Sequence, residues 1–297
     1  MKNSYQSNEA PMKSENFHAN RILKKMSLKF RHLTSSIRIL PSFIIIGFPR
    51  CGTTSLYNYL IQHPSVAPPL KKEIFFFGAN FEKGINWYKR YFPTLLYKYQ
   101  IRKHFRNYFL TGEGSATYIH HPLASDRIKK TIPHAKLIVM LRNPIDRAYS
   151  QYFKIVNIGR ENLSFEDAIE IESKRIEGEW EKMINNKNYY SMDYHNYSYL
   201  SSGIYVDKLR GWLNSFPKDQ ILILRSEDFY NDPSSIFKTT LKFLNLPNWE
   251  LQKYKKYNYY DNKPPLDPTI RKKLVDYFKP HNERLNKLLG RNFGWDK

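Results

Sequence analysis

The chain contains 297 residues, 41% hydrophobic and 16% aromatic, so it can bury the core of one large α/β domain or two small ones. No stretch approaches the roughly 18 consecutive apolar residues of a membrane span, and the single cysteine, Cys51, excludes an intramolecular disulfide framework. The net charge of +21 would allow the protein to bind polyanions. An AT-rich genome would produce the same excess of lysine, so the charge alone does not identify a polyanion-binding protein.

Residues 1–42 form a predicted basic leader. Six basic side chains and no acidic one occur between Arg21 and Arg38. We predict a poorly ordered arm, and a membrane-surface or targeting helix is the alternative. No apolar signal-peptide core follows the early basic residues, and a lone cysteine fits a reducing compartment. We therefore expect a cytoplasmic protein.

After Pro41 the sequence alternates between strand and helix patterns. "FIIIGF" (43–48) is an uninterrupted apolar run, which indicates a parallel strand covered on both faces, and "TTSLYNYLIQHP" is the helix that follows it. "AKLIVML" and "QILIL" are two further predicted strands. This alternation predicts an α/β fold with a central parallel sheet flanked by helices, in one domain over residues 43–297.

The second half of the chain is predominantly helical. Ser164 opens a charged helix, predicted over 164–183, with Asp167 three residues later in a capping arrangement. The other predicted helices are "IDRAYSQYFKIV", the amphipathic "GIYVDKLRGWLNSFP", "DPSSIFKTTLKFLNLP" and the long C-terminal segment from "DPTIRKKL" onward.

The turn "GFPRCGTTS" between the first strand and its helix is a candidate anion site. A glycine-rich turn directs backbone N–H groups and the positive helix end at an anion, and Thr53 and Thr54 add hydroxyls. An ordinary capped helix is the alternative. A phosphoryl-transfer loop needs Lys after the second glycine, where Thr53 stands, and its cation is displaced to Arg50. The strand "KLIVML" ends in Arg142, not in the Asp that would hold Mg²⁺.

A second basic element, "LRNPIDRAYSQY", follows a buried strand. Arg142 therefore lies at the carboxyl edge of the sheet, where a guanidinium can clamp a phosphate, and the hydroxyl of Ser150 lies eight residues on. A surface ion pair between Arg142 and Asp146 is the alternative. Two anion sites at one edge without metal ligands suggest a cofactor that carries two anionic groups.

These two elements resemble the 5′-phosphosulfate loop and the 3′-phosphate motif of sulfotransferases that use 3′-phosphoadenosine 5′-phosphosulfate (PAPS). The resemblance covers residues 42–297 and is strongest to the heparan sulfate and carbohydrate sulfotransferases and their bacterial relatives. Further segments resemble later blocks of that branch in order and at similar spacing: "KKEIFFFG", "GEGSATYI", "GIYVDKLRGWL" and the C-terminal helix. The resemblance implies a P-loop-like three-layer fold and no metal.

The resemblance also assigns roles to residues. It implies that Glu73 is the general base, that Lys72 and Glu73 contact the acceptor, and that Arg50 stabilises the departing phosphate. The apolar run after Glu73 should bury its surroundings and raise its pKa. The residues implied to bind the cofactor are Arg50, Cys51, Gly52, Thr53, Thr54, Ser55, Arg142, Ser150 and Lys263.

Three positions depart from that pattern: Arg50 replaces the usual Lys, Phe75 stands where many members have His, and Gly114 where they often have Lys. We expect a glycan or small-molecule acceptor, and the sequence leaves a sugar, a lipid glycan, a small alcohol and a peptide tyrosine open. We expect no nucleic-acid partner and no transmembrane segment, and the oligomeric state is not readable. A metal-dependent P-loop nucleotide kinase and a non-catalytic polyanion-binding protein are the alternative functions.

Overall fold

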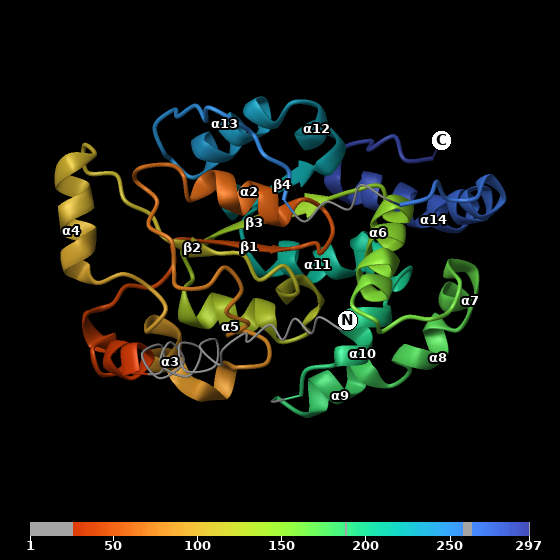
Figure 1. Ribbon diagram of the computed structural model, residues 1–297, viewed down its shortest axis with the longest axis horizontal. Helices are drawn as coiled ribbons and strands as arrows, with labels where there is room; N and C mark the ends of the chain where they lie inside the picture. The colour runs from red at the N-terminus through yellow and green to blue at the C-terminus, as the bar shows by residue number, and fades with distance from the viewer. Residues whose placement is uncertain (1–25, 188, 258–262, 297) are drawn as a thin grey trace, which may run out of the picture.

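A four-stranded parallel sheet lies at the centre of the computed structural model, which describes residues 26–187, 189–257 and 263–296. Helices cover both faces of the sheet (Figure 1), as the sequence predicts. The strand order is β2-β1-β3-β4. The strands are β1 (Phe43–Gly47), β2 (Gly112–Glu113), β3 (Lys136–Leu141) and β4 (Ile221–Arg225).

The three predicted strands are confirmed, and their burial explains their composition. All five residues of β1 are buried, as are the last five of β3, because helices pack on both faces of the sheet. The sequence analysis missed β2, which has only two residues and a polar composition. Gly112 is required there because a Cβ at this position would come within 2.5 Å of the Phe43 ring.

The helices predicted from the sequence begin at or near the expected residues, and the structure adds several that the sequence analysis did not predict. Figure 1 shows α2, α12 and α13 on one side of the sheet and α5 and α11 on the other, while α6 stands beyond the carboxyl ends of the strands. The helices are α2 (Thr53–Leu60), α3 (Gly84–Lys89), α4 (Leu95–His104), α5 (Ala124–Thr131), α6 (Pro144–Asn157), α7 (Phe165–Glu170), α8 (Glu172–Ile176), α9 (Glu179–Asn185), α10 (Met192–Tyr197), α11 (Tyr205–Ser215), α12 (Ser226–Asn231), α13 (Pro233–Phe243) and α14 (Pro268–Leu289). Short 3₁₀ helices are η1 (Ser35–Ile37), η2 (Phe81–Lys83), η3 (Tyr118–His120), η4 (Ser201–Gly203) and η5 (Lys218–Gln220).

The single charged helix predicted from Ser164 is wrong in its extent. The Ser164 cap forms, since its hydroxyl accepts from the Asp167 amide at 3.1 Å, but the segment divides into α7, α8 and α9. Glu177 leaves helical geometry at ψ 130°, and Gly178 follows at φ 69°, which is left-handed and which glycine alone adopts without strain. The charged residues continue across this break, so the sequence pattern alone indicated one uninterrupted helix.

Residues 26–42 differ from the predicted poorly ordered leader. Residues 26–33 are helical, Leu28 packs against the main core, and Arg31 donates to the carbonyls of Arg90 and Phe92 at 2.7 and 2.8 Å. These contacts fold the segment onto the domain. Residues 1–25 lie outside the described part of the chain, and the division into a leader and one domain stays a prediction.

No helix in the described residues is both long enough and apolar enough to cross a bilayer.

The start of α6 is fixed by a cap that matters for the site. The Asn143 side chain accepts from the amides of Ile145 and Asp146, at 3.0 and 3.4 Å, and Pro144 occupies the first turn. A side-chain acceptor at this position satisfies donors that the helix itself cannot. The cap thereby sets the direction of the helix that carries Ser150.

We expect Asn143→Ala to lower the free energy of unfolding by about 1 kcal/mol, because the cap acceptor is lost. This corresponds to a decrease in Tm of about 2–4 °C for a chain of this size. Differential scanning calorimetry measures the change, and Asn143→Ser, which keeps an oxygen acceptor, is the matched control. Equal Tm values for Asn143→Ala and the wild type would contradict this role.

Candidate active site

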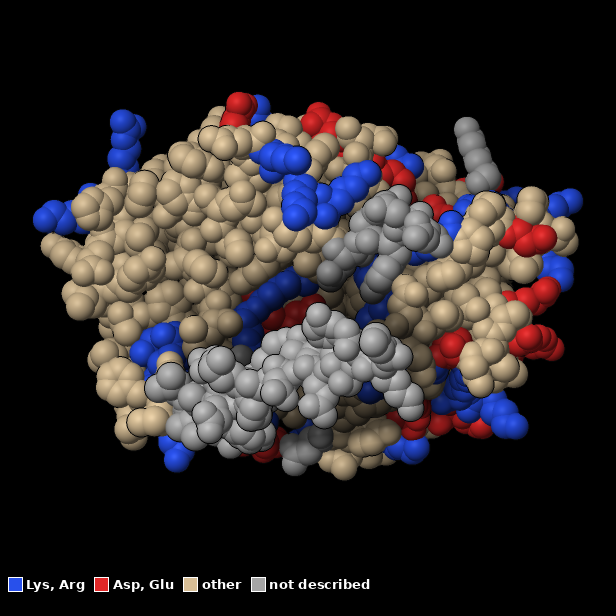
Figure 2. Space-filling model, viewed as in Figure 1, with Lys and Arg blue, Asp and Glu red and all other residues tan. Residues whose placement is uncertain are grey.

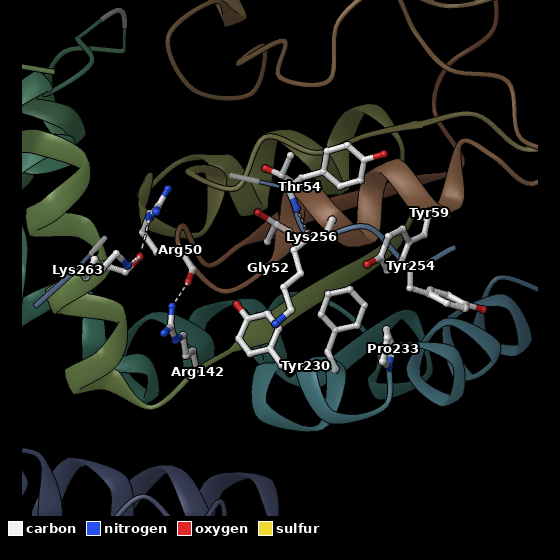
Figure 3. A pocket seen from close by; sticks show the side chains of 15 residues that line it. Arg50, Gly52, Thr54, Tyr59, Arg142, Tyr230, Pro233, Tyr254, Lys256 and Lys263 are labelled. Atoms are coloured by element: carbon white, nitrogen blue, oxygen red, sulfur yellow. Dashed lines mark hydrogen bonds between the residues drawn. The ribbon is translucent and has the colours of Figure 1, made fainter. Parts of the chain in front are cut away.

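The turn from β1 into α2 has the geometry that an anion site requires. Gly52, which precedes the first residue of α2, has φ 88°, and Arg50 two residues earlier has φ 69°. Both values lie in the left-handed region, where glycine is favoured and a larger residue is strained. Arg50, Gly52 and the first residues of α2, Thr53 and Thr54, line one cavity, which Figure 3 shows with the Arg50 side chain beside it.

This cavity, of about 270 Å³, lies at the carboxyl edge of the sheet and collects most of the predicted cofactor residues. Its described lining contains four cationic side chains and no carboxylate. The predicted residues in the lining are Arg50, Gly52, Thr53, Thr54, Ser55, Arg142, Ser150 and Lys263. The remaining lining residues are Tyr59, Phe229, Tyr230, Pro233, Tyr254, Lys256 and Tyr257.

Two of the cations meet at one neutral oxygen. Arg50 Nε donates to Ser150 Oγ at 3.1 Å, and Lys263 Nζ donates to the same oxygen at 3.2 Å. Arg142 joins them by donating to the Arg50 carbonyl at 3.3 Å, as the dashed lines in Figure 3 show. The turn after β1 and the segment that carries Lys263 therefore meet at Ser150, and the edge of β3 is joined to them through the Arg50 carbonyl.

The surroundings of Lys263 disfavour its charged form. Burial, together with repulsion from the nearby Arg142 and Arg50, lowers the pKa of Lys263 to about 8, and Asp146 opposes the shift. An anion in the cavity would raise the pKa again. The ion pair between Arg142 and Asp146, considered from sequence, is not formed, because Asp146 pairs with Arg271 at 2.6 Å.

The hydroxyls of the loop have separate partners. Ser55 Oγ accepts from the Tyr257 amide at 3.0 Å, which ties α2 to the segment that carries Lys256. Thr54 Oγ1 accepts from Lys72 Nζ at 2.8 Å. Thr53 is buried at the start of α2 and lines the cavity.

Cys51 does not line the cavity, although the resemblance placed it among the cofactor residues. Its side chain is fully buried behind the turn, 3.9 Å from the Tyr205 hydroxyl. Burial raises the pKa of the Cys51 thiol to about 11, so the thiol stays protonated at neutral pH. Cys51 packs the back of the turn.

Glu73 lies next to the loop, but its surroundings differ from those expected. Its carboxylate accepts from Lys72 Nζ at 3.0 Å, and its side chain is 42% exposed. The apolar run that follows Glu73 buries Phe76 and Phe77 and leaves the carboxylate in contact with solvent. The surroundings of Glu73 are thus buried as predicted, but the carboxylate itself is not, and its contact with Lys72, which also bonds to Thr54, agrees with a place beside the anion site.

The buried carboxylate of this region is Glu113, in the segment "GEGSATYI". It is fully buried and accepts from the hydroxyls of Tyr88, Tyr118 and Ser115 and from the Ile74 amide. Burial raises the pKa of Glu113 to about 7, although these hydrogen bonds oppose the shift. Because Ile74 directly follows Glu73, Glu113 anchors the loop that carries the candidate base.

The sequence analysis also missed residues around Glu73. Lys154 lies one helical turn after Ser150 on α6. Burial lowers the pKa of Lys154, Arg50 lowers it further and Glu73 raises it, so its ammonium acts on both parts of the site. The ring of Phe75 lies 6.4 Å from that of Tyr190. No signal in the sequence links Tyr190 to this loop, since the contact is purely tertiary.

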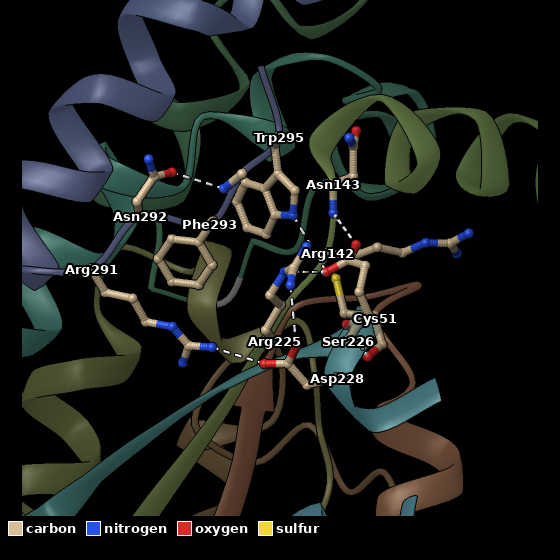
Figure 4. Close-up of polar contacts among 12 residues, drawn as sticks. Cys51, Arg142, Asn143, Arg225, Ser226, Asp228, Arg291, Asn292, Phe293 and Trp295 are labelled. Carbon is tan, nitrogen blue, oxygen red and sulfur yellow. Dashed lines mark hydrogen bonds and ion pairs between the residues drawn. The ribbon is translucent and has the colours of Figure 1, made fainter. Parts of the chain in front are cut away.

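A polar network behind the turn fixes the ends of β3 and β4 (Figure 4). The Glu227 carboxylate accepts from the Asn143 amide at 2.7 Å and from Trp295 Nε1 at 3.3 Å, and it pairs with Arg225 at 3.2 Å. Ser226 donates to the Cys51 carbonyl at 2.8 Å. These bonds connect the turn, the edge of the sheet and the end of the chain into one support.

The described residues contain no cluster of three or more His, Cys, Asp or Glu side chains placed to hold a metal ion.

Comparison with known proteins identifies the class to which this fold and site belong. The model of the sulfotransferase domain family matches residues 40–280. A solved sulfotransferase from Alicyclobacillus acidocaldarius superimposes with a TM-score of 0.64 at 28% identity, covering 87% of this chain and all of that one. The chain belongs to the sulfotransferase family, which favours this class over the kinase and the non-catalytic alternatives.

Curated relatives give a finer comparison. The chain is 30% identical to the membrane-associated sulfotransferase kil1 of Dictyostelium discoideum, covering 86% of this chain and 66% of that protein. It is 29% identical to a bifunctional heparan sulfate N-deacetylase/N-sulfotransferase of Caenorhabditis elegans, over 85% of this chain and 30% of the relative. It is 27% identical to a mouse heparan sulfate glucosamine 3-O-sulfotransferase, over 86% of this chain and 65% of the relative. The chain thus spans between about a third and two thirds of these relatives.

The raised pKa of Glu113 predicts a pH dependence of stability. Because the folded-state pKa of about 7 exceeds the ordinary value of 4.5, the stabilisation is complete below pH 4.5 and is lost as the pH rises through 7. Glu113→Gln cannot titrate, so the stability of the wild type relative to this variant should fall between pH 4.5 and 7 and level off above.

Urea unfolding at a series of pH values measures this difference. Glu82→Gln, at an exposed position on η2, is the control and should give a pH profile parallel to that of the wild type. A constant difference between the wild type and Glu113→Gln across this range would show that burial does not raise the pKa of Glu113.

Proposed function

We propose that this protein transfers the sulfuryl group of PAPS to a hydroxyl or amine of an acceptor. The observation that carries the proposal is a cavity in which Arg50 and Lys263 both donate to Ser150 and Arg142 donates to the Arg50 carbonyl, and whose described lining has no carboxylate. Such a lining suits a ligand with more than one anionic group. Membership of the sulfotransferase family supports the choice of PAPS.

The residues divide between the two ends of this donor. Arg142, Ser150 and Lys263 hold the 3′-phosphate, and the amides after Gly52 with the Thr53 and Thr54 side chains hold the 5′-phosphosulfate. The donor supplies an activated sulfuryl group when it is bound. Arg50 lies in contact with Ser150 and with Arg142, so it can stabilise negative charge on either side, in place of the usual lysine.

The acceptor reacts on the side of the cavity where Glu73 lies. A hydroxyl or amine that attacks sulfur must lose a proton, and the partly exposed Glu73 carboxylate is open to an entering acceptor. Lys72 contacts both Glu73 and Thr54 and positions the carboxylate relative to the loop. Glu73 acts as the general base in this proposal, and Lys72 and Glu73 contact the acceptor.

We propose a carbohydrate acceptor, because the heparan sulfate N- and 3-O-sulfotransferases among the relatives act on glycans by name. Heparan sulfate itself is not assigned, since Phe75 and Gly114 depart from the pattern of that branch. A cytoplasmic location stays a proposal, and kil1 of Dictyostelium is described as membrane-associated. Cell fractionation with antibody detection tests the location.

The donor is tested with adenosine 3′,5′-bisphosphate, the product that PAPS leaves. We expect this compound to raise the Tm at micromolar concentrations, and MgATP at the same concentration to raise it less. Labelled-sulfate transfer from PAPS to a panel of glycans then identifies the acceptor. The proposed donor is wrong if the bisphosphate neither stabilises the protein nor competes with labelled PAPS.

Arg142→Ala should weaken binding of adenosine 3′,5′-bisphosphate roughly 10- to 100-fold, because charge-assisted hydrogen bonds of about 1.5–3 kcal/mol are lost. Isothermal titration calorimetry measures this affinity. Arg284→Ala is the matched control, since it removes an arginine that pairs with Asp207 away from the cavity. An unchanged affinity in Arg142→Ala would remove Arg142 from the donor site.

Glu73→Gln should reduce kcat roughly 10²- to 10⁴-fold while the affinity for the bisphosphate is retained, because only the proton acceptor is lost. Labelled-sulfate transfer to the acceptor found in the glycan screen measures kcat, and calorimetry measures the affinity. Glu82→Gln removes a nearby exposed carboxylate and should turn over at the wild-type rate. Normal turnover in Glu73→Gln would exclude Glu73 as the base.

A further inference from the structure

The helix over residues 26–33 has two faces of opposite character. One face is anchored: Leu28 packs on the core, and Arg31 donates to the Arg90 and Phe92 carbonyls. On the other face, Met26, Phe30 and Leu33 are 61%, 64% and 80% exposed. Their spacing of four and three residues places them on a single helical stripe. The anchored face keeps this apolar stripe directed at solvent.

The helix α4 is equally unusual, because none of its ten residues is buried. Leu95, Leu96 and Tyr99 are each more than half exposed, and their spacing places them on one face. Figure 1 shows α4 at the edge of the molecule, well away from the sheet. An isolated helix of this length is marginal in water, so α4 lacks the burial that normally stabilises such an element.

Backbone pairing joins the two segments. Arg38 forms an antiparallel bridge with Thr94, the residue that caps α4, and the Ile39 amide donates to the Pro93 carbonyl at 3.1 Å. The exposed Ile37 and Leu95 immediately flank this bridge. The bridge thus makes the two segments neighbours, and we call their exposed side chains, those of residues 26–37 and of α4, the apolar–basic face.

The charge of this face has a single sign. Residues 26–38 and 94–111 contain no Asp or Glu. Basic side chains lie among the apolar ones: Lys98, Arg102 and Lys103 line a surface groove on α4 together with Leu95 and Tyr99, and Lys29 is exposed on the first helix. In Figure 2 the end of the molecule that carries α4 shows blue and tan atoms without red.

We propose that the apolar–basic face docks on the surface of an anionic lipid bilayer. Apolar and tyrosine side chains would enter the interface between headgroups and acyl chains, while lysine and arginine contact the lipid phosphates. A second copy of the chain fits less well, because two faces of the same positive sign repel. A soluble polyanion would use the charges but not Phe30, Leu33 or Leu96.

Co-sedimentation of the full chain with large unilamellar vesicles tests the proposal. We expect strong partition onto vesicles of phosphatidylcholine with 30% phosphatidylserine, chosen as about the anionic content of a cytoplasmic leaflet, and little onto pure phosphatidylcholine. The charge variant Lys98→Gln/Arg102→Gln/Lys103→Gln should lower the partition coefficient at least about tenfold. Its matched control is Lys272→Gln/Lys279→Gln/Lys287→Gln, which removes three exposed charges from α14 and should bind like the wild type.

The apolar contribution is tested with Phe30→Ser/Leu96→Ser, which keeps every charge. This variant should also lose at least about tenfold in partition, whereas Ile158→Ser, at an exposed apolar position on the C-terminal side of α6, should not. Retention of thermal stabilisation by adenosine 3′,5′-bisphosphate shows that each variant is folded.

Three results would overturn the proposal. The first is an equal loss of vesicle binding in the α14 control, which would indicate attraction by net charge alone. The second is unchanged vesicle binding in Phe30→Ser/Leu96→Ser combined with weaker retention of the charge variant on heparin, which would indicate a soluble polyanion. The third is a wild-type dimer in sedimentation velocity that Phe30→Ser/Leu96→Ser converts to monomers, which would indicate a second copy of the chain.

Discussion

The candidate site brings several positively charged side chains close together, and the surrounding structure must hold them there. The side chains of Arg50, Arg142 and Lys263 share one cavity, and in the described lining their interactions with each other run through neutral oxygens, the Ser150 hydroxyl and the Arg50 carbonyl. Such an arrangement persists only if the backbone cannot relax. The turn before α2, the cap of α6 and the Glu227 network supply that rigidity, because each fixes one of the segments from which the cations extend.

The parts of this arrangement that the sequence could predict are those with a local cause. Apolar runs long enough to be covered on both faces gave three of the four strands, and a parallel sheet places all their carboxyl ends at one edge. It follows from the pattern alone that Arg142, after β3, lies near the turn after β1. The identity of the residues in the turn, Gly52 above all, follows from backbone sterics.

The remainder depends on contacts between distant segments. Glu113 is buried and Glu73 is partly exposed, although the apolar run that follows Glu73 buries the surroundings of both. Burial of a carboxylate is set by which hydroxyls surround it, and those of Tyr88 and Tyr118 come from elsewhere in the chain. Lys256 and Tyr230 enter the cavity from segments without a motif. The strand β2 has only two residues, which is too short to show the alternation of apolar and polar side chains by which a strand is recognised in a sequence.

The crowding of cations has a thermodynamic consequence for the molecule as a whole. In the folded chain, burial and repulsion from Arg142 and Arg50 both disfavour the charged form of Lys263 and lower its pKa, and both effects are absent once the chain unfolds. Any bound anion relieves this repulsion and adds its own binding energy to the folded state. The melting temperature should therefore depend on the concentration of any anion in solution that binds in this cavity.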